Sequence, residues 1–209
     1  MKNQLMKAVA ASALTALGLV ASSGAQAALV SRLGGKAFYD NVADLTWLQD
    51  ANFAKTSGFI GDGALIWNDA NFWAGSLNIG GVTGWRLPGG PMASGFNQTA
   101  SEMGNLFHNV LGGVAFTSIG TNHNANYDLF SNVQPFAYWS GVEFDSSRAW
   151  VFAFGNGFQV NLAKTGRTLA WAVHTGDVGA VPLPGALLLM GPAMLGLLGL
   201  GRSQRRGCP

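Results

Sequence analysis

Side chains that could act as nucleophiles, general bases or metal ligands are few and widely separated in this 209-residue chain. The three histidines, His108, His123 and His174, lack the short spacings shared by metal-binding motifs. The single cysteine, Cys208, stands next to the C-terminal residue, so the preceding sequence offers no thiol nucleophile and no disulfide. We interpret the histidines as surface or packing residues and expect no metal and no organic cofactor.

Paired carboxylates are another route to acid–base chemistry, and glycoside hydrolysis uses such a pair. The two groups must face one cleft at a defined separation. The candidates are Asp69, Glu102, Glu143 and Asp145. Spacing along the chain does not fix their separation in space, so a secreted glycan-active enzyme stays open as an alternative to a non-catalytic protein.

The triplet WND at residues 67–69 is also found at the calcium sites of sugar-binding C-type lectins, and oxygen-rich TNHNANYD at 121–128 could supply further ligands. In those lectins the triplet lies on a strand, whereas here it opens an amphipathic pattern. We therefore interpret Asn68 and Asp69 as residues of a helix start. Calcium is the less favoured alternative.

The motif GWRLP places a guanidinium among apolar neighbours, at Gly84, Trp85, Arg86, Leu87 and Pro88. The proline disfavours helix at the residue before it. Because its flanks are apolar and cations are scarce nearby, we predict that Arg86 is held inside the fold by a carboxylate and carbonyl oxygens. The alternative is an outward Arg86 that binds an acidic sugar. The candidate carboxylate partners are Asp44, Asp69 and Glu102.

Seven tryptophans allow two interpretations, since a tryptophan face can stack on a sugar ring or fill a core. They are Trp47, Trp67, Trp73, Trp85, Trp139, Trp150 and Trp171. Because they lie within regular amphipathic patterns, we predict that at least five belong to the core.

Two amphipathic helices must position these groups. The first is predicted around residues 67–77, where apolar residues recur at helical spacing before Gly80 and Gly81 end the pattern. The second is predicted over 99–111, with Thr99 and Glu102 as a capping box and Gly112 as its end. Its apolar face consists of Met103, Leu106, Phe107, Val110 and Leu111.

Aromatic and β-branched runs predict strands over 136–144, 148–154, 158–162 and 168–174, with earlier strands at 36–40 and 45–49. In the third run, Phe158, Val160 and Leu162 alternate with polar Gln159 and Asn161. GNG at 155–157 is typical of a hairpin turn. The expected fold class is α+β, with two helices packed on a twisted antiparallel meander.

The N-terminus, residues 1–27, has the pattern of a secretory signal peptide. Lys2 and Lys7 precede an apolar stretch, and Ala25 and Ala27 form a small-x-small cleavage site. The expected partners are the Sec translocon and signal peptidase.

The C-terminus, residues 179–209, combines a VPLP motif, an apolar span and an arginine cluster. These parts are Val181, Pro182, Leu183 and Pro184, then residues 186–201, then Arg202, Arg205 and Arg206. As a helix the 16-residue span would measure about 24 Å, enough to cross a bilayer with the residues before it. The arginines would stay in the cytoplasm and leave the intervening domain, residues 28–178, outside.

That domain carries seven Lys/Arg against ten Asp/Glu, a formal balance of −3. Nucleic-acid binding requires a basic stripe, so we exclude nucleic acid as a partner.

Several motifs of the middle of the chain resemble the Lcl C-terminal domain family, a domain of unknown function in the C-type-lectin-like superfamily. They run in order as DLTWLQDANFA, WNDANFWAGSL, GWRLP, SEMGNLF, YWSG, AWVFAFGNGFQ and AWAVHTGDV. The resemblance implies a C-type-lectin-like fold. Family members often carry arginine after AWAV, where this chain has His174.

The tail closely resembles PEP-CTERM sorting signals in their VPLP variant. That resemblance implies an exosortase-type membrane protease as a partner, an inner-membrane intermediate, and delivery to the cell surface or extracellular matrix. The expected function is an exported non-catalytic protein that associates with extracellular polysaccharide. A purely structural matrix protein without a discrete ligand is a further alternative.

Overall fold

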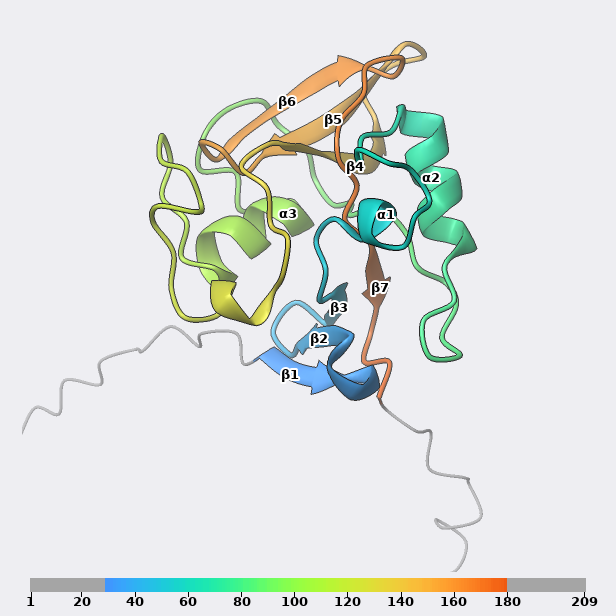
Figure 1. Ribbon diagram of the computed structural model, residues 1–209. Coiled ribbons are helices and arrows are strands. Elements are labelled where there is room, and N and C mark those ends of the chain that lie inside the picture. Colours follow the sequence, from blue (N-terminus) through green and yellow to red (C-terminus); the bar gives the residue numbers. More distant parts are fainter. Residues whose placement is uncertain (1–28, 180–209) are drawn as a thin grey trace, which may run out of the picture.

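The computed structural model describes residues 29–179, which form a mixed helix and sheet fold with two separate antiparallel sheets (Figure 1). The strands are β1 (Leu29–Arg32), β2 (Ala37–Asp40), β3 (Leu45–Leu48), β4 (Ala137–Glu143), β5 (Arg148–Ala153), β6 (Phe158–Ala163) and β7 (Val173–Thr175). The helices are α1 (Phe53–Thr56), α2 (Trp67–Ser76) and α3 (Glu102–Asn105), with short turns η1 (Leu33–Gly35), η2 (Leu106–Val110) and η3 (Tyr127–Leu129). The sheets lie at opposite ends of the molecule with the helices between them (Figure 1).

The three-stranded sheet is the predicted meander, in the order β4-β5-β6. Its β5–β6 hairpin closes through the predicted GNG turn, where Gly157 adopts a φ of 74° and donates its N–H to the Ala153 carbonyl at 2.8 Å. Only glycine enters this left-handed region without a steric penalty, which explains the residue at the turn. The meander prediction is confirmed for these three strands.

The fourth predicted strand, over 168–174, is wrong in extent and in partner. Only β7 is a strand, and it pairs with β3 in the other sheet, whose order is β1-β2-β3-β7. The preceding residues bridge both sheets: the Trp139 N–H donates to the Leu169 carbonyl at 2.8 Å, and the Leu48 N–H donates to the Ala172 carbonyl at 3.1 Å. One apolar run therefore serves two sheets, because it is buried on every side.

Helix α2 confirms the first predicted helix and its buried face. Ala70, Trp73 and Ala74 are buried, and Asp69 lies in the first turn. The residue before the helix is Ile66, and no side chain caps it. The expectation that Asn68 and Asp69 lie at a helix start holds for their position, but neither side chain is the N-cap.

The second helix is confirmed in its apolar face but not in its cap. All five predicted face residues are buried. The N-cap is Ser101, whose hydroxyl accepts the Gly104 N–H at 3.1 Å, so the prediction of Thr99 is wrong. After α3 the chain widens into the π-helical turn η2. This turn ends at Val110, and Gly112, which follows two residues later, has a φ of 75°.

The alternation read in β6 does not follow its burial. Gln159 is only 1% exposed, whereas Leu162 is among the exposed hydrophobic residues. The reason is the segment that follows Pro88, which crosses this strand: Gly95 and Gln159 exchange two backbone hydrogen bonds at 2.9 Å. The Gln159 amide also donates to the Ala93 carbonyl and accepts from the Ser101 hydroxyl, so its burial leaves no polar atom unpaired.

Trp171 occupies the centre of the core between the two sheets. Its ring contacts Trp47, Phe130, Tyr138 and Phe154 at centroid separations of 5.2–5.9 Å. Six of the seven tryptophans are buried, and Trp67 is partly buried. The prediction of at least five core tryptophans is confirmed.

None of the helices in the described part has the length and hydrophobicity required to cross a membrane.

Candidate functional site

The GWRLP motif connects the two sheets. Arg86 and Val173 of β7 exchange two backbone hydrogen bonds at 2.9 Å, and the Pro88 carbonyl accepts from Ser140 and Gly141 of β4. Trp85 and Leu87 are buried on either side of the arginine. The motif therefore has a structural position at the junction of the sheets.

The Arg86 side chain meets Glu102, one of its three predicted partners. Two hydrogen bonds of 2.7 and 2.8 Å join the guanidinium to both carboxylate oxygens, and a third reaches the Leu87 carbonyl at 3.1 Å. Glu102 also accepts the Gly89 N–H at 2.6 Å. The predicted carboxylate and carbonyl partners are thus confirmed. The predicted position inside the fold is reached only in part, because the Arg86 side chain is 38% exposed against 19% for Glu102.

The other candidate carboxylates lie in separate ion pairs. Glu143 pairs with Lys164, and Asp145 pairs with Arg148. Hydrogen bonds from Ser147 and Arg148 lower the pKa of Asp145 well below its ordinary value, so this carboxylate is ionised at neutral pH. Glu102, Glu143 and Asp145 are thus each bound to a different cation, whereas Asp69 lies in the first turn of α2. None of the three clefts described for residues 29–179 is lined by two of these carboxylates.

The three histidines are held separately by ring contacts and carbonyl groups. His108 donates from Nδ1 to the Gly113 carbonyl at 3.0 Å, and burial lowers its pKa. His123 stacks on Tyr127, and His174 meets Trp85 edge-on. Among residues 29–179 no three His, Cys, Asp or Glu side chains gather in a group that could hold a metal ion.

The predicted signal cleavage residues, Ala25 and Ala27, lie outside the described residues. The same holds for the sorting residues, Val181, Pro182, Leu183, Pro184, Arg202, Arg205 and Arg206.

An open cleft of about 380 Å³ lies where the end of β3 meets α1 and the turn after α2. Leu48, Phe53 and Ile79 form its apolar wall, and four polar side chains complete it: Lys36, Gln49, Asp50 and Asn78. The Gln49 N–H donates to the Lys36 carbonyl at 2.9 Å and so fixes the two strand ends beside each other.

A tight turn positions Asn78 at the rim of this cleft. Ile79 and Val82 exchange two backbone hydrogen bonds, of 2.9 and 3.1 Å, and the Asn78 side-chain oxygen accepts the Gly81 N–H. The Asn78 NH₂ group has no hydrogen-bond partner among residues 29–179.

Charge in the cleft comes from one carboxylate and one ammonium group. Asp50 accepts from the Asn52 N–H at 2.9 Å and from the Thr56 hydroxyl at 2.6 Å, which fixes its orientation. Lys36 is exposed, and it is one of two cations in the described part, with Lys55, that have no carboxylate within 4.0 Å. The cleft thus presents a fixed acceptor, an amide donor and an unpaired cation beside an aromatic ring.

A model of the Lcl C-terminal domain matches residues 36–174. The chain belongs to the Lcl C-terminal domain family. No curated protein matches it. The matched region begins at Lys36, so β1 lies outside it although all four β1 residues pair with β2.

The sequence did not point to the cleft of this Lcl C-terminal domain. Leu48, Gln49, Asp50 and Phe53 all belong to the segment WLQDANF, whose echo recurs as WNDANFW at 67–73. The first copy lines the cleft with both polar and apolar residues, whereas the second copy forms the first part of helix α2. That echo is the one signal that could have directed attention to these residues.

Proposed function

We propose that this protein is an exported, non-catalytic surface or matrix protein whose Lcl C-terminal domain associates with extracellular polysaccharide. The observation that carries the proposal is the open cleft formed by Lys36, Asp50, Phe53 and Asn78. Its volume falls in the range of small-ligand sites, which begins at roughly 300 Å³.

The chemistry of the cleft suits a sugar. A hydroxyl group both donates and accepts hydrogen bonds, so it matches a carboxylate acceptor next to amide and ammonium donors. The partly buried Phe53 adds an apolar surface for the C–H groups of a pyranose ring. Because the cleft is open, a long chain can pass through it without a free end.

A binding role accords with the carboxylates that line the cleft. Glycoside hydrolysis generally requires two carboxyl groups, about 5–5.5 Å or about 6.5–9.5 Å apart. Asp50 is the single carboxylate among the lining residues, and both of its oxygens already accept hydrogen bonds. We therefore favour binding over the glycan-active enzyme.

Export is proposed from the two ends of the sequence. The segment before Ala27 has the features of a signal peptide for the Sec translocon and signal peptidase, and the VPLP tail resembles substrates of an exosortase. On this proposal the apolar span holds an inner-membrane intermediate before the domain reaches the cell surface or matrix. The C-type-lectin-like fold implied by the family resemblance accords with the mixed helices and antiparallel sheets.

Affinity electrophoresis of the purified full chain tests the cleft. Native gels in non-ionic detergent would contain a neutral β-glucan, a neutral mannan or alginate. We expect at least one polysaccharide to retard the wild type, and we expect Lys36→Ala and Asn78→Ala each to reduce the apparent affinity at least fivefold. Lys55→Ala is the matched control, since Lys55 is also exposed and unpaired but does not line the cleft.

If Lys36→Ala, Asn78→Ala and the wild type are retarded equally, the cleft is not the polysaccharide-binding site. A wild type that no polysaccharide retards would contradict the proposed function itself.

A further inference from the structure

Three phenylalanines that the proposed cleft does not use form a cluster at the surface, on segments far apart in the sequence. The ring centroids of Phe96 and Phe116 are 3.9 Å apart, and those of Phe96 and Phe158 are 4.6 Å apart. Phe116 is 75% exposed, the most exposed large hydrophobic side chain of the described residues. We call Phe96, Phe116 and Phe158 the phenylalanine patch.

The backbone of Phe116 is held in a costly conformation. Its φ of 67° lies in the left-handed region, where a bulky side chain is a true outlier. The loop is fixed on both sides: the Phe116 N–H donates to the Asn156 carbonyl at 2.8 Å, and the Ile119 N–H donates to the Phe154 carbonyl at 3.0 Å. Ile119 is fully buried, which anchors the loop in the core.

Such strain persists where the surrounding structure imposes it, and it concentrates at binding sites. Here its result is an aromatic ring presented to solvent in a fixed place. A relaxed loop would allow the Phe116 ring to turn inward. The fold instead keeps this ring exposed, although contact between an apolar side chain and water is unfavourable.

The three chain segments that carry the patch are polar but uncharged. The segments 89–100, 111–122 and 154–162, which carry the three rings, contain no Asp, Glu, Lys or Arg. Amide side chains border the rings instead: Gln98 donates to the Phe96 carbonyl, and Asn156 accepts the Phe158 N–H. These segments offer no counter-ion to a charged ligand, whereas a neutral ligand would meet an aromatic face and amide groups on them.

We propose that the phenylalanine patch is a second binding site, which takes a neutral polysaccharide by stacking a pyranose ring on the exposed Phe116, whose ring Phe96 supports from within the patch. The C–H groups on a sugar face carry partial positive charge and match the negative face of an aromatic ring. Amides at the rim match the hydroxyl groups at the edge of the sugar. This inference rests on the proposed function, since it assumes that the protein meets polysaccharide.

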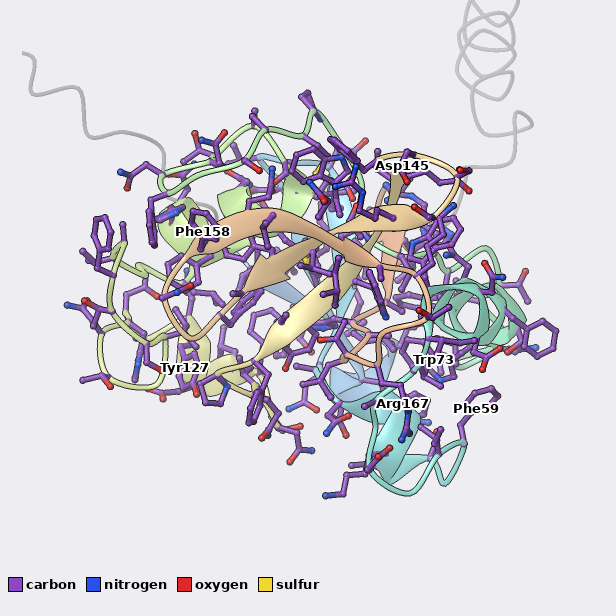
Figure 2. The ribbon with its side chains drawn as sticks, turned by 90° about the horizontal axis from the view of Figure 1, so that it is seen from above. Phe59, Trp73, Tyr127, Asp145, Phe158 and Arg167 are labelled. Carbon is purple, nitrogen blue, oxygen red and sulfur yellow. The ribbon has the colours of Figure 1, made fainter. Side chains whose placement is uncertain are left out.

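The patch lies far from helix α2. Phe158 and Trp73 of α2 stand on opposite sides of the molecule (Figure 2). Phe72, also on α2, is 70% exposed and outside the patch, which makes it a matched control for the loss of an exposed ring.

The test uses the full chain in native gels containing the neutral β-glucan, the neutral mannan or alginate. We expect Phe116→Ala and Phe116→Leu to weaken binding to a neutral polysaccharide at least tenfold, with melting temperatures within a few degrees of the wild type. Phe116→Tyr keeps the ring and should bind like the wild type, and Phe72→Ala should change the affinity less than twofold. Retention of binding by Phe116→Leu would overturn ring stacking.

The failure of this proposal is distinguishable from that of the proposed function. If Phe116→Ala binds like the wild type while Lys36→Ala loses binding, the patch is not a polysaccharide site and the cleft proposal stands. If no polysaccharide retards the wild type, the proposed function and the neutral ligand both fall. Sedimentation velocity detects another occupant: a wild-type dimer that Phe116→Ala converts to monomer would overturn the proposal in favour of a contact between two copies.

Discussion

At the scale of single residues, Arg86 and Glu102 form an ion pair with two hydrogen bonds at the junction of the sheets, and Glu102 also accepts the Gly89 N–H. Removing the guanidinium leaves a carboxylate that is 19% exposed without its cation. We expect Arg86→Ala to lower the free energy of unfolding by about 2–3 kcal/mol, below the roughly 3–5 kcal/mol of a fully buried pair because Arg86 is partly solvated. Arg86→Lys should retain less than half of the free energy that Arg86→Ala loses, since the lysine ammonium group cannot bond both carboxylate oxygens in the same geometry.

Urea denaturation measures this difference, with Arg148→Ala as the control. Arg148 pairs with Asp145 three residues away at an exposed site, where ion pairs contribute little to stability. If Arg86→Ala and Arg148→Ala lower the free energy of unfolding equally, the Arg86–Glu102 pair stabilises the fold no more than an exposed ion pair does.

His108 should make stability depend on pH. Burial lowers its pKa, and the hydrogen bond to the Gly113 carbonyl offsets only part of that effect. Well above pH 6.5, the ordinary pKa of histidine, the imidazole is neutral in both the folded and the unfolded chain. As the pH falls below 6.5, the unfolded chain takes up a proton that the folded chain does not, so the free energy of unfolding decreases.

Denaturation curves at pH 7, 6 and 5 measure the decrease, which for one histidine is at most about 1.4 kcal/mol per pH unit. His108→Gln should flatten the dependence in this window. The carboxylates whose pKa is lowered, Asp62 and Asp145, act below about pH 4 and leave the window clear. An unchanged slope in His108→Gln would show that another group titrates.

At the scale of elements, two helical glycines predict opposite effects of alanine. A methyl group on Gly104 of α3 would overlap the Gln98 carbonyl oxygen of the loop before the helix. At Gly75 of α2 the same methyl group meets nothing within 4 Å. Gly104→Ala should therefore lower the melting temperature sharply or prevent folding, whereas Gly75→Ala should raise stability by about 0.5–1 kcal/mol.

Thermal melts followed by circular dichroism compare the two variants directly. A Gly104→Ala protein that melts with the wild type would mean that the loop over α3 moves away at little cost.

Helices and strands were predictable from the sequence where their hydrophobic pattern matches how they are buried. Helix α2 follows its pattern because one of its faces packs against the core. Strands β4 and β5 were predictable from their aromatic and β-branched runs, although β5 is buried on both faces. Gln159 departed from its pattern because a loop distant in sequence covers that strand, and the run 168–174 was misread because it serves two sheets. The sequence predicted three possible carboxylate partners for Arg86 but did not distinguish among them. Glu102 is the partner because of the path that the loop over 89–101 takes back to α3. The cleft escaped prediction because three chain segments, distant in sequence, build it.

At the scale of the whole molecule, the proposed export route predicts where altered chains accumulate. Replacing Pro182 and Pro184 by alanine, or Arg202, Arg205 and Arg206 by glutamine, should leave the precursor in the inner membrane. Fractionation with immunoblotting measures this, because an uncut apolar span remains in the bilayer. In the wild type, mass spectrometry of the surface fraction should find no peptide beyond about residue 185, and recovery of peptides containing Cys208 there would contradict processing.

The last described residues, 176–179, also fasten the chain to the four-stranded sheet. The Thr46 hydroxyl donates to the Gly176 carbonyl at 2.7 Å, and two hydrogen bonds of 2.5 and 2.6 Å join Arg32 to Asp177. Any mechanical load applied through the C-terminal end therefore reaches the Arg32–Asp177 clasp before it reaches the short strand β7. Because Arg32 belongs to β1, at the other edge of the sheet from β7, the clasp spreads a pulling force over the width of the sheet and protects β7 from being peeled away first.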